Sequence, residues 1–258
     1  MIVNVLFPPS LGRARAQARA EPFADVLALG LGDEVRVEVV STYEELERRV
    51  LANQVDLAWA PPIICARAQR TARAILTAVR GGRSTYCSAW VSRADHHLAL
   101  TDLAGLRAAW VDRLSTAGYL LSVAQLRSRG SEPDRIFASQ QFYGSYEAAL
   151  GAVLGGEADV CAVFSRTESP AAARRTIRDF VHDDHAKLHP FAYSATVPQD
   201  GLVLTSRLPV RQGDAVLERV VRATDGSKGP TALLTLLDAE RLVPAGPNDY
   251  NHLRHVLG

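Results

Sequence analysis

The feature that most constrains the fold is a regular alternation of strand and helix patterns over residues 2–60. Three segments have the composition of strands: Ile2–Phe7, Glu34–Val40 and Val55–Ala60. Because helical patterns separate them, the segment predicts an α/β unit with a mostly parallel sheet. Ligands of such sheets bind beyond the carboxyl ends of the strands.

The two intervening segments carry helix signals of different kinds. Arg13–Leu29 is rich in Ala and Arg, and we expect this helix to break near Pro22. The second helix begins at a capping box, in which Glu45 follows Thr42 by three positions. Tyr43 then falls in the first turn of that helix, at the predicted ligand edge.

A second informative segment is the octet Asp112–Tyr119, which follows the apolar run Ala108–Val111. Apolar residues recur at helical spacing after it, so the octet is expected to turn a strand directly into a helix. Ser115 suits the N-cap, and Thr116 adds a second hydroxyl. Free amides, hydroxyls and the helix dipole together make an anion site. An ordinary Ser-capped helix is the alternative interpretation.

The octet resembles the Ser-Thr-Ser/Ala-Gly-Tyr signature of phosphate/phosphonate-type solute-binding proteins of ABC transporters. Val55–Pro61 is similar to that family's Val-Asp-x-Ala-x-x-Gly-Pro segment, with Ala60 in place of Gly. Further similarity lies in Gly144–Leu150, in Gly155–Phe164 and in the closing segment Asn248–Arg254. The motifs keep the family's order from about Val3 to the C-terminus.

The resemblance implies a two-lobe α/β fold of the periplasmic-binding-protein-like type 2 class, with a two-strand hinge. Lobe one would comprise residues 1–88 and 195–258, and lobe two residues 89–194. Each lobe would hold a mostly parallel sheet flanked by helices. The ligand would lie between the lobes.

The resemblance also places ligand contacts on both lobes. Lobe one would supply Tyr43, Pro61 and Tyr86, and lobe two Ser115, Thr116, Ala117, Tyr146 and Asp159. A half-buried strand tyrosine is the alternative for Tyr86, and a structural carboxylate bonded to neighbouring amides is the alternative for Asp159. The ligand would be bound by amides and hydroxyls more than by Arg or Lys.

Two positions depart from the family pattern. Tyr146 replaces the usual His, and Ala117 lacks a hydroxyl that relatives carry. A Tyr stays neutral where a His can gain a proton near neutral pH. We therefore expect a ligand that is less charged or more apolar than the typical one.

Two classes of function fit these motifs. The first is non-catalytic binding of a small oxyanion, such as a phosphonate or a phosphate ester, as a solute-binding or sensor protein. The second is an enzyme on the same scaffold, similar to menaquinone-pathway or thiamine-precursor enzymes.

The sequence has no Gly-x-Ser-x-Gly, Walker or Gly-x-Gly-x-x-Gly motif, and we assign no catalytic residue and no cofactor. His182–His185 with His189 lacks zinc-site spacing, so we expect no metal site.

Charge and hydropathy restrict the partners. With 29 Lys and Arg against 28 Asp and Glu, the net charge of +1 gives no general attraction to nucleic acid. The expected partners are a small-molecule anion and an ABC permease or a signalling domain.

No apolar run is long enough for membrane insertion. Met1–Phe7 lacks the features of a signal peptide, which predicts a cytoplasmic protein, or a periplasmic one if an export signal precedes the sequence.

Overall fold

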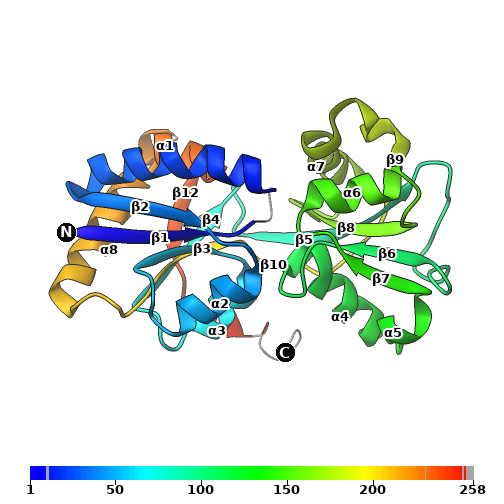
Figure 1. Ribbon diagram of the computed structural model, residues 1–258, viewed down its shortest axis with the longest axis horizontal. Coiled ribbons are helices and arrows are strands. Elements are labelled where there is room, and N and C mark those ends of the chain that lie inside the picture. The colour runs from blue at the N-terminus through cyan, green and yellow to red at the C-terminus, as the bar shows by residue number, and fades with distance from the viewer. Residues whose placement is uncertain (10–11, 230, 252, 254–258) are drawn as a thin grey trace.

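The computed structural model describes residues 1–9, 12–229, 231–251 and 253, and it contains two six-stranded sheets side by side (Figure 1). The first sheet has the order β12-β4-β11-β3-β1-β2, and the second has the order β10-β5-β8-β6-β7 with β9 paired to β5. The first sheet holds β1 (Ile2–Phe7), β2 (Glu34–Val39), β3 (Leu57–Ala60), β4 (Ala74–Val79), β11 (Gly201–Leu204) and β12 (Arg241–Pro244). The second holds β5 (Thr85–Arg93), β6 (Arg107–Trp110), β7 (Ser139–Phe142), β8 (Val160–Ser165), β9 (Leu188–Tyr193) and β10 (Val197–Pro198).

Helices cover both faces of each sheet (Figure 1). The first sheet carries α1 (Arg13–Leu31), α2 (Tyr43–Leu51), α3 (Pro62–Ala68), α8 (Val210–Ala223) and α9 (Ala232–Leu236). The second carries η1 (Thr116–Leu120), α4 (Leu121–Ser128), α5 (Pro133–Ile136), α6 (Tyr146–Leu154), α7 (Pro170–Val181) and η2 (His182–Lys187). A short turn of 3₁₀ helix, η3, spans Gly226–Lys228.

Both sheets are mixed, where the sequence predicted mostly parallel ones. β2, β1 and β3 pair in parallel as expected, but β11 lies antiparallel between β3 and β4, and β12 is antiparallel to β4. In the second sheet β7, β6 and β8 are parallel, whereas β5 is antiparallel to β8, β9 and β10. The chain returns from the second lobe through β10 and β11. Both strands pair antiparallel with their neighbours, so the parallel βαβ pattern does not continue through them.

Two segments connect the sheets. β5 extends from the first lobe into the second, and β10 brings the chain back through a pairing of Val197 with Tyr86 (Figure 1). This arrangement has the two crossovers that the sequence predicted. The lobe boundaries at residues 88 and 195 fall on these crossovers and stay a prediction.

One local expectation was wrong. α1 continues through Pro22, because Pro22 and Ala18 are both exposed and water can satisfy the carbonyl that loses its helical partner. Between β5 and β6 the chain forms a turn, in which the Asp102 carboxylate accepts a hydrogen bond from the Ala99 amide at 2.8 Å. Elsewhere the strand and helix limits agree with the sequence interpretation within a few residues.

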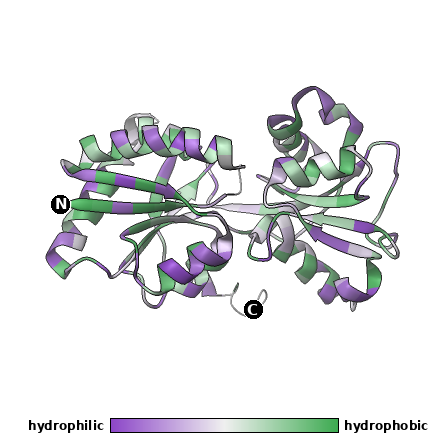
Figure 2. Ribbon diagram, in the orientation of Figure 1, coloured by the Kyte–Doolittle hydropathy of each residue, from purple (hydrophilic) through white to green (hydrophobic). Residues whose placement is uncertain are grey.

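Buried apolar side chains pack between each sheet and its helices, and Figure 2 shows hydrophobic residues along strands of both sheets. On β1 and β3 they alternate between two cores: Phe7 and Trp59 pack with α1 and α9, whereas Leu6 and Ala60 pack toward α2 and α3. Residues near the carboxyl ends of β1 and β3 therefore contact the helices on both faces of the first sheet.

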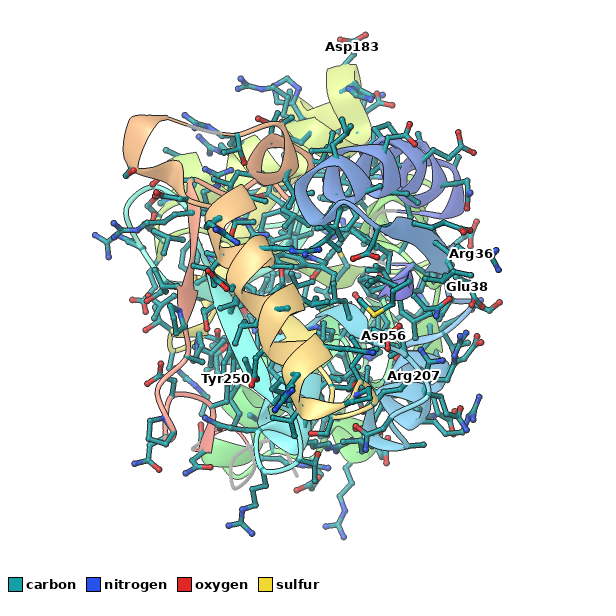
Figure 3. The ribbon with its side chains drawn as sticks, turned by 90° about the vertical axis from the view of Figure 1, so that its left-hand side faces the viewer. Arg36, Glu38, Asp56, Asp183, Arg207 and Tyr250 are labelled. Atoms are coloured by element: carbon teal, nitrogen blue, oxygen red, sulfur yellow. The ribbon has the colours of Figure 1, made fainter. Side chains whose placement is uncertain are left out.

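The two sheets are anchored in the same way at the amino ends of their strands. Asp56, just before β3, accepts a hydrogen bond from the Asn4 amide at 2.8 Å and pairs with Arg207 at 2.7 Å (Figure 3). Asp159, just before β8, accepts from the Arg107 amide at 2.8 Å and pairs with the Arg107 guanidinium at 2.7 Å. Each carboxylate thus fastens a strand to its parallel neighbour.

The closing segment Asn248–Arg254 lies partly outside the described residues, which exclude His252 and Arg254. Tyr250 is fully buried, and its hydroxyl donates to the Gln199 carbonyl at 2.8 Å. Among the described residues, no helix has the length and apolar character needed to cross a membrane.

Candidate functional site

A cavity of about 930 Å³, its open mouth included, lies between the two lobes. It sits at the carboxyl ends of β1 and β3, the position that the sequence predicted for a ligand. Six of the eight predicted site residues line it: Tyr43, Pro61, Tyr86, Ser115, Thr116 and Tyr146.

The octet forms the predicted strand-to-helix turn, with one unexpected detail. Ser115 is the N-cap, and its hydroxyl accepts a hydrogen bond from the Gly118 amide at 3.2 Å. The first turn, Thr116–Leu120, is a π-helix, closed by a bond from the Leu120 amide to the Ser115 carbonyl at 3.0 Å. A β-carbon on Gly118 would lie 2.4 Å from Cγ2 of Val111, so the close strand-to-helix packing requires glycine there.

The octet leaves a hydrogen-bond donor at the cavity. Thr116 lines the cavity, and no described residue accepts a hydrogen bond from its backbone amide. The Thr116 hydroxyl accepts from the Ile63 amide of α3 at 3.3 Å, which leaves its own proton free to donate. Donors at the start of a helical segment are suited to an anion.

Three tyrosines from different elements face the same cavity. Burial raises the pKa of Tyr86 well above its ordinary value, and the neighbours that act on its charge include Tyr43 and Tyr146. Burial likewise raises the pKa of Tyr146, opposed in part by a hydrogen bond with Ser115. The Tyr146 ring packs against Phe164 with centroids 5.5 Å apart. The hydroxyls of Tyr86 and Tyr146 therefore stay protonated and act as neutral hydrogen-bond donors.

A half-buried carboxyl and a guanidinium occupy the lobe-one side. Desolvation of the half-buried Asp200 raises the pKa of its carboxyl, and Arg80 opposes the rise. Arg80 lies 3.5 Å from the Asp200 carboxylate and donates to the carbonyls of Leu237 and Asp238 at 3.1 and 2.7 Å. The Arg80 guanidinium also lies over the Trp59 ring, 5.7 Å from its centroid. Its donors are thus largely used within the protein.

Side chains from the two lobes contact each other around the cavity. Arg166, after β8, donates to both carboxylate oxygens of Asp238, after α9, at 3.0 and 3.2 Å. Arg15 of α1 donates to the Asp179 carbonyl of α7 at 3.0 Å and lies over the Phe180 ring. The structure is therefore a closed arrangement of the two lobes.

Two predicted site residues do not line the cavity. Ala117 is a buried residue of the octet, and its carbonyl accepts a hydrogen bond from Ser88 at 2.7 Å. Asp159 lies at the amino end of β8, on the edge of the sheet away from the cavity, where it pairs with Arg107. This contact agrees with the alternative interpretation of Asp159, a structural carboxylate bonded to a neighbouring amide.

Several lining residues were missed by the sequence interpretation. They are chiefly Arg19, Trp59, Arg80, Arg166, Gln199, Asp200 and Asp238. Asp200 had a detectable signal, because it lies between the crossover at Val197-Pro198 and the buried strand β11. The arginines had none, since nothing in their local sequence separates them from the many surface arginines of this chain.

The comparisons with known proteins agree with this geometry. A family model described as "ABC transporter, phosphonate, periplasmic substrate-binding protein" matches residues 5–250. The chain belongs to this family. The resemblance carried by the octet and its companion motifs is thereby confirmed, and a substrate-binding protein of this kind has a small-molecule ligand and an ABC permease as partners.

Solved structures confirm the fold of this binding protein. A binding protein component of an ABC phosphonate transporter from Pseudomonas aeruginosa is 17% identical, with a TM-score of 0.83 over 99% of this chain and 85% of that one. PhnD1 from Prochlorococcus marinus, in complex with methylphosphonate, is 18% identical, with a TM-score of 0.81 over 99% and 96%. A Xanthomonas citri protein bound to ATP is 16% identical, with a TM-score of 0.74 over 99% and 95%.

Family membership favours binding over catalysis. The family is defined by substrate-binding proteins of transporters, so the enzymatic alternative has no support. Cys65, Cys87 and Cys161 are free and buried, and burial raises the pKa of each thiol, which disfavours a nucleophilic thiolate. The part of the chain that the structure describes holds no group of three or more His, Cys, Asp or Glu able to bind a metal ion.

Proposed function

We propose that this protein binds a small organic phosphonate, or a closely similar oxyanion, in the cavity between its lobes and presents it to an ABC permease. The observation that carries the proposal is the convergence of the octet with three tyrosine hydroxyls in one buried space. The free amide of Thr116, the hydroxyls of Ser115 and Thr116 and the tyrosines would surround the oxyanion. Such a site selects by hydrogen-bond geometry, because each donor left without a partner costs about 1–3 kcal/mol.

The Prochlorococcus marinus relative, crystallised with methylphosphonate, supports this class of ligand. Both methylphosphonate and inorganic phosphate offer oxygens to hydrogen-bond donors. The neutral hydroxyls of Tyr86 and Tyr146 favour the less charged of the two. The location of the protein stays a prediction, which fractionation of cells that express the natural gene would test.

The direct test is titration calorimetry with methylphosphonate on the full chain and on the double variant Ser115→Ala with Thr116→Val. Two lost hydrogen bonds of about 0.5–1.5 kcal/mol each should weaken binding by about tenfold or more. A matched control is Ser128→Ala with Thr101→Val, since both hydroxyls are exposed and lie outside the cavity. Unchanged affinity in the double variant would remove the octet from the site.

A further inference from the structure

The cavity extends beyond the octet and reaches around the end of the first sheet. Tyr43 belongs to the core on the α2 side, whereas Phe7 and Trp59 belong to the core on the α1 side, and all three line the cavity. α1 and α9 complete the far end with Ala16, Leu236 and neighbouring residues. A ligand held at the octet therefore has an apolar extension of the cavity available to it.

The charges that line the cavity are unequal in number. Three arginines and two aspartates line the cavity: Arg19, Arg80, Arg166, Asp200 and Asp238. Arg166 pairs with Asp238, and Arg80 lies against Asp200. These two contacts balance the negative charges of both carboxylates. One of the three arginines is then not matched by a carboxylate of the cavity.

The remaining cation is Arg19 of α1. Its side chain is half-buried, and it has no hydrogen bond, ion pair or ring contact with any residue that the structure describes. A guanidinium presents a planar fork of donors that fits a carboxylate or a phosphate oxygen pair. In a cavity that Phe7 and Leu236 also line, this group favours an anionic partner supplied by the ligand.

We infer that the natural ligand is a phosphonate with an apolar body and a second, terminal anionic group that Arg19 binds. This inference rests on the proposed function and extends it: the octet holds the phosphonate, the chain of the ligand passes Phe7 and Trp59, and the terminal group reaches α1. Arg19 is then the residue that distinguishes such ligands from alkylphosphonates and from aminoalkylphosphonates.

Calorimetry on the full chain tests the inference with three matched series of increasing chain length: alkylphosphonates, phosphonates ending in a carboxylate, and phosphonates ending in an amine. At least one carboxylate should bind about tenfold more tightly than the alkyl compound of equal length, and the amine should bind more weakly than either. An added series ending in a second phosphonate identifies which anionic group the far end prefers.

Arg19→Gln should reduce the ratio of carboxylate to alkyl affinity to about one. Arg129→Gln removes the same charge from an exposed arginine outside the cavity and should leave the ratio unchanged. Thermal unfolding of both variants checks that they fold. A preference for the amine, equal affinities for carboxylate and alkyl ligands, or an unchanged ratio in Arg19→Gln would overturn this inference alone. If no phosphonate of any series binds, the proposed function fails with it.

Discussion

Arg166 and Asp238 form an ion pair that joins the two lobes, with distances of 3.0 and 3.2 Å from the guanidinium to the two carboxylate oxygens. Arg166 follows the carboxyl end of β8, Asp238 follows α9, and both line the cavity. The walls of the site therefore come together only when the lobes are closed. A ligand that contacts both walls stabilises this closed state by its differential affinity.

We predict that ligand binding closes the lobes and reduces the radius of gyration in solution scattering. Asp238→Asn should weaken ligand binding by a few fold, because a partly exposed ion pair contributes about 0–1 kcal/mol. Glu218→Gln is the control, since it removes an exposed pair with Arg222 within α8. If saturating methylphosphonate leaves the scattering profile unchanged, the hinge interpretation is wrong.

Tyr146→His should change the preferred charge of the ligand. The tyrosine stays neutral because burial raises its pKa, whereas an imidazole gains a proton below about pH 6.5 and then favours a dianion. The variant should gain affinity for phosphate relative to methylphosphonate at low pH, as measured by calorimetry at two pH values. Tyr146→Phe removes only the hydroxyl and should show no such pH dependence. Tight phosphate binding by the unmodified protein, with no gain in the His variant, would contradict this prediction.

Asp200→Asn should alter the pH dependence of stability. Burial raises the pKa of the Asp200 carboxyl, so the folded protein retains this proton to a higher pH than the unfolded chain does. The stability from this group is complete below the ordinary Asp pKa of about 3.9 and is lost as pH rises through the raised pKa. The variant should therefore flatten the fall in unfolding free energy above that pH.

Denaturant titrations at a series of pH values measure this effect. Asp183→Asn serves as the control, because Asp183 is exposed and projects away from the protein on η2 (Figure 3). A slope equal to that of the unmodified protein in Asp200→Asn would show that Asp200 does not hold its proton in this way.

Gly118→Ala should destabilise the protein and impair binding together. The new β-carbon would lie 2.4 Å from Cγ2 of Val111 and 2.7 Å from Oγ of Ser115, which forces the octet away from its strand. Overpacking of this kind costs about 1–3 kcal/mol. Gly151→Ala on α6 is the contrasting variant, because no atom lies within 4 Å of its added β-carbon, and it should be neutral or stabilising. Calorimetry and thermal unfolding of both variants provide the comparison, and equal behaviour would contradict the packing argument.

The sequence predicted the fold class and most of the octet side of the site because those signals are local. Strand and helix periods, the Ser115 cap and the motif order each depend on neighbouring residues. The mixed pairing of the sheets depends instead on where the returning chain enters, and no local pattern specifies the place of β11 between β3 and β4.

Asp159 and Asp200 illustrate this limit. Both precede buried strands, but β8 is parallel to its neighbour β6 whereas β11 is antiparallel to β3 and β4. The amino end of a parallel strand lies away from the ligand edge, and the amino end of an antiparallel strand lies on it. Asp159 therefore anchors two strands, whereas Asp200 lines the cavity. This difference can be predicted only when the sheet topology is known.

Asp56 and Asp159 hold their strands at the ends opposite the cavity. In each sheet, the amino ends of the parallel strands are thus held by groups that do not face the ligand. The carboxyl ends of these strands carry the residues that do. Randomising the cavity residues in a mutant library would leave both fastenings intact, so new ligand preferences could be selected with little loss of folded protein. This separation makes the chain a suitable starting point for an engineered optical sensor.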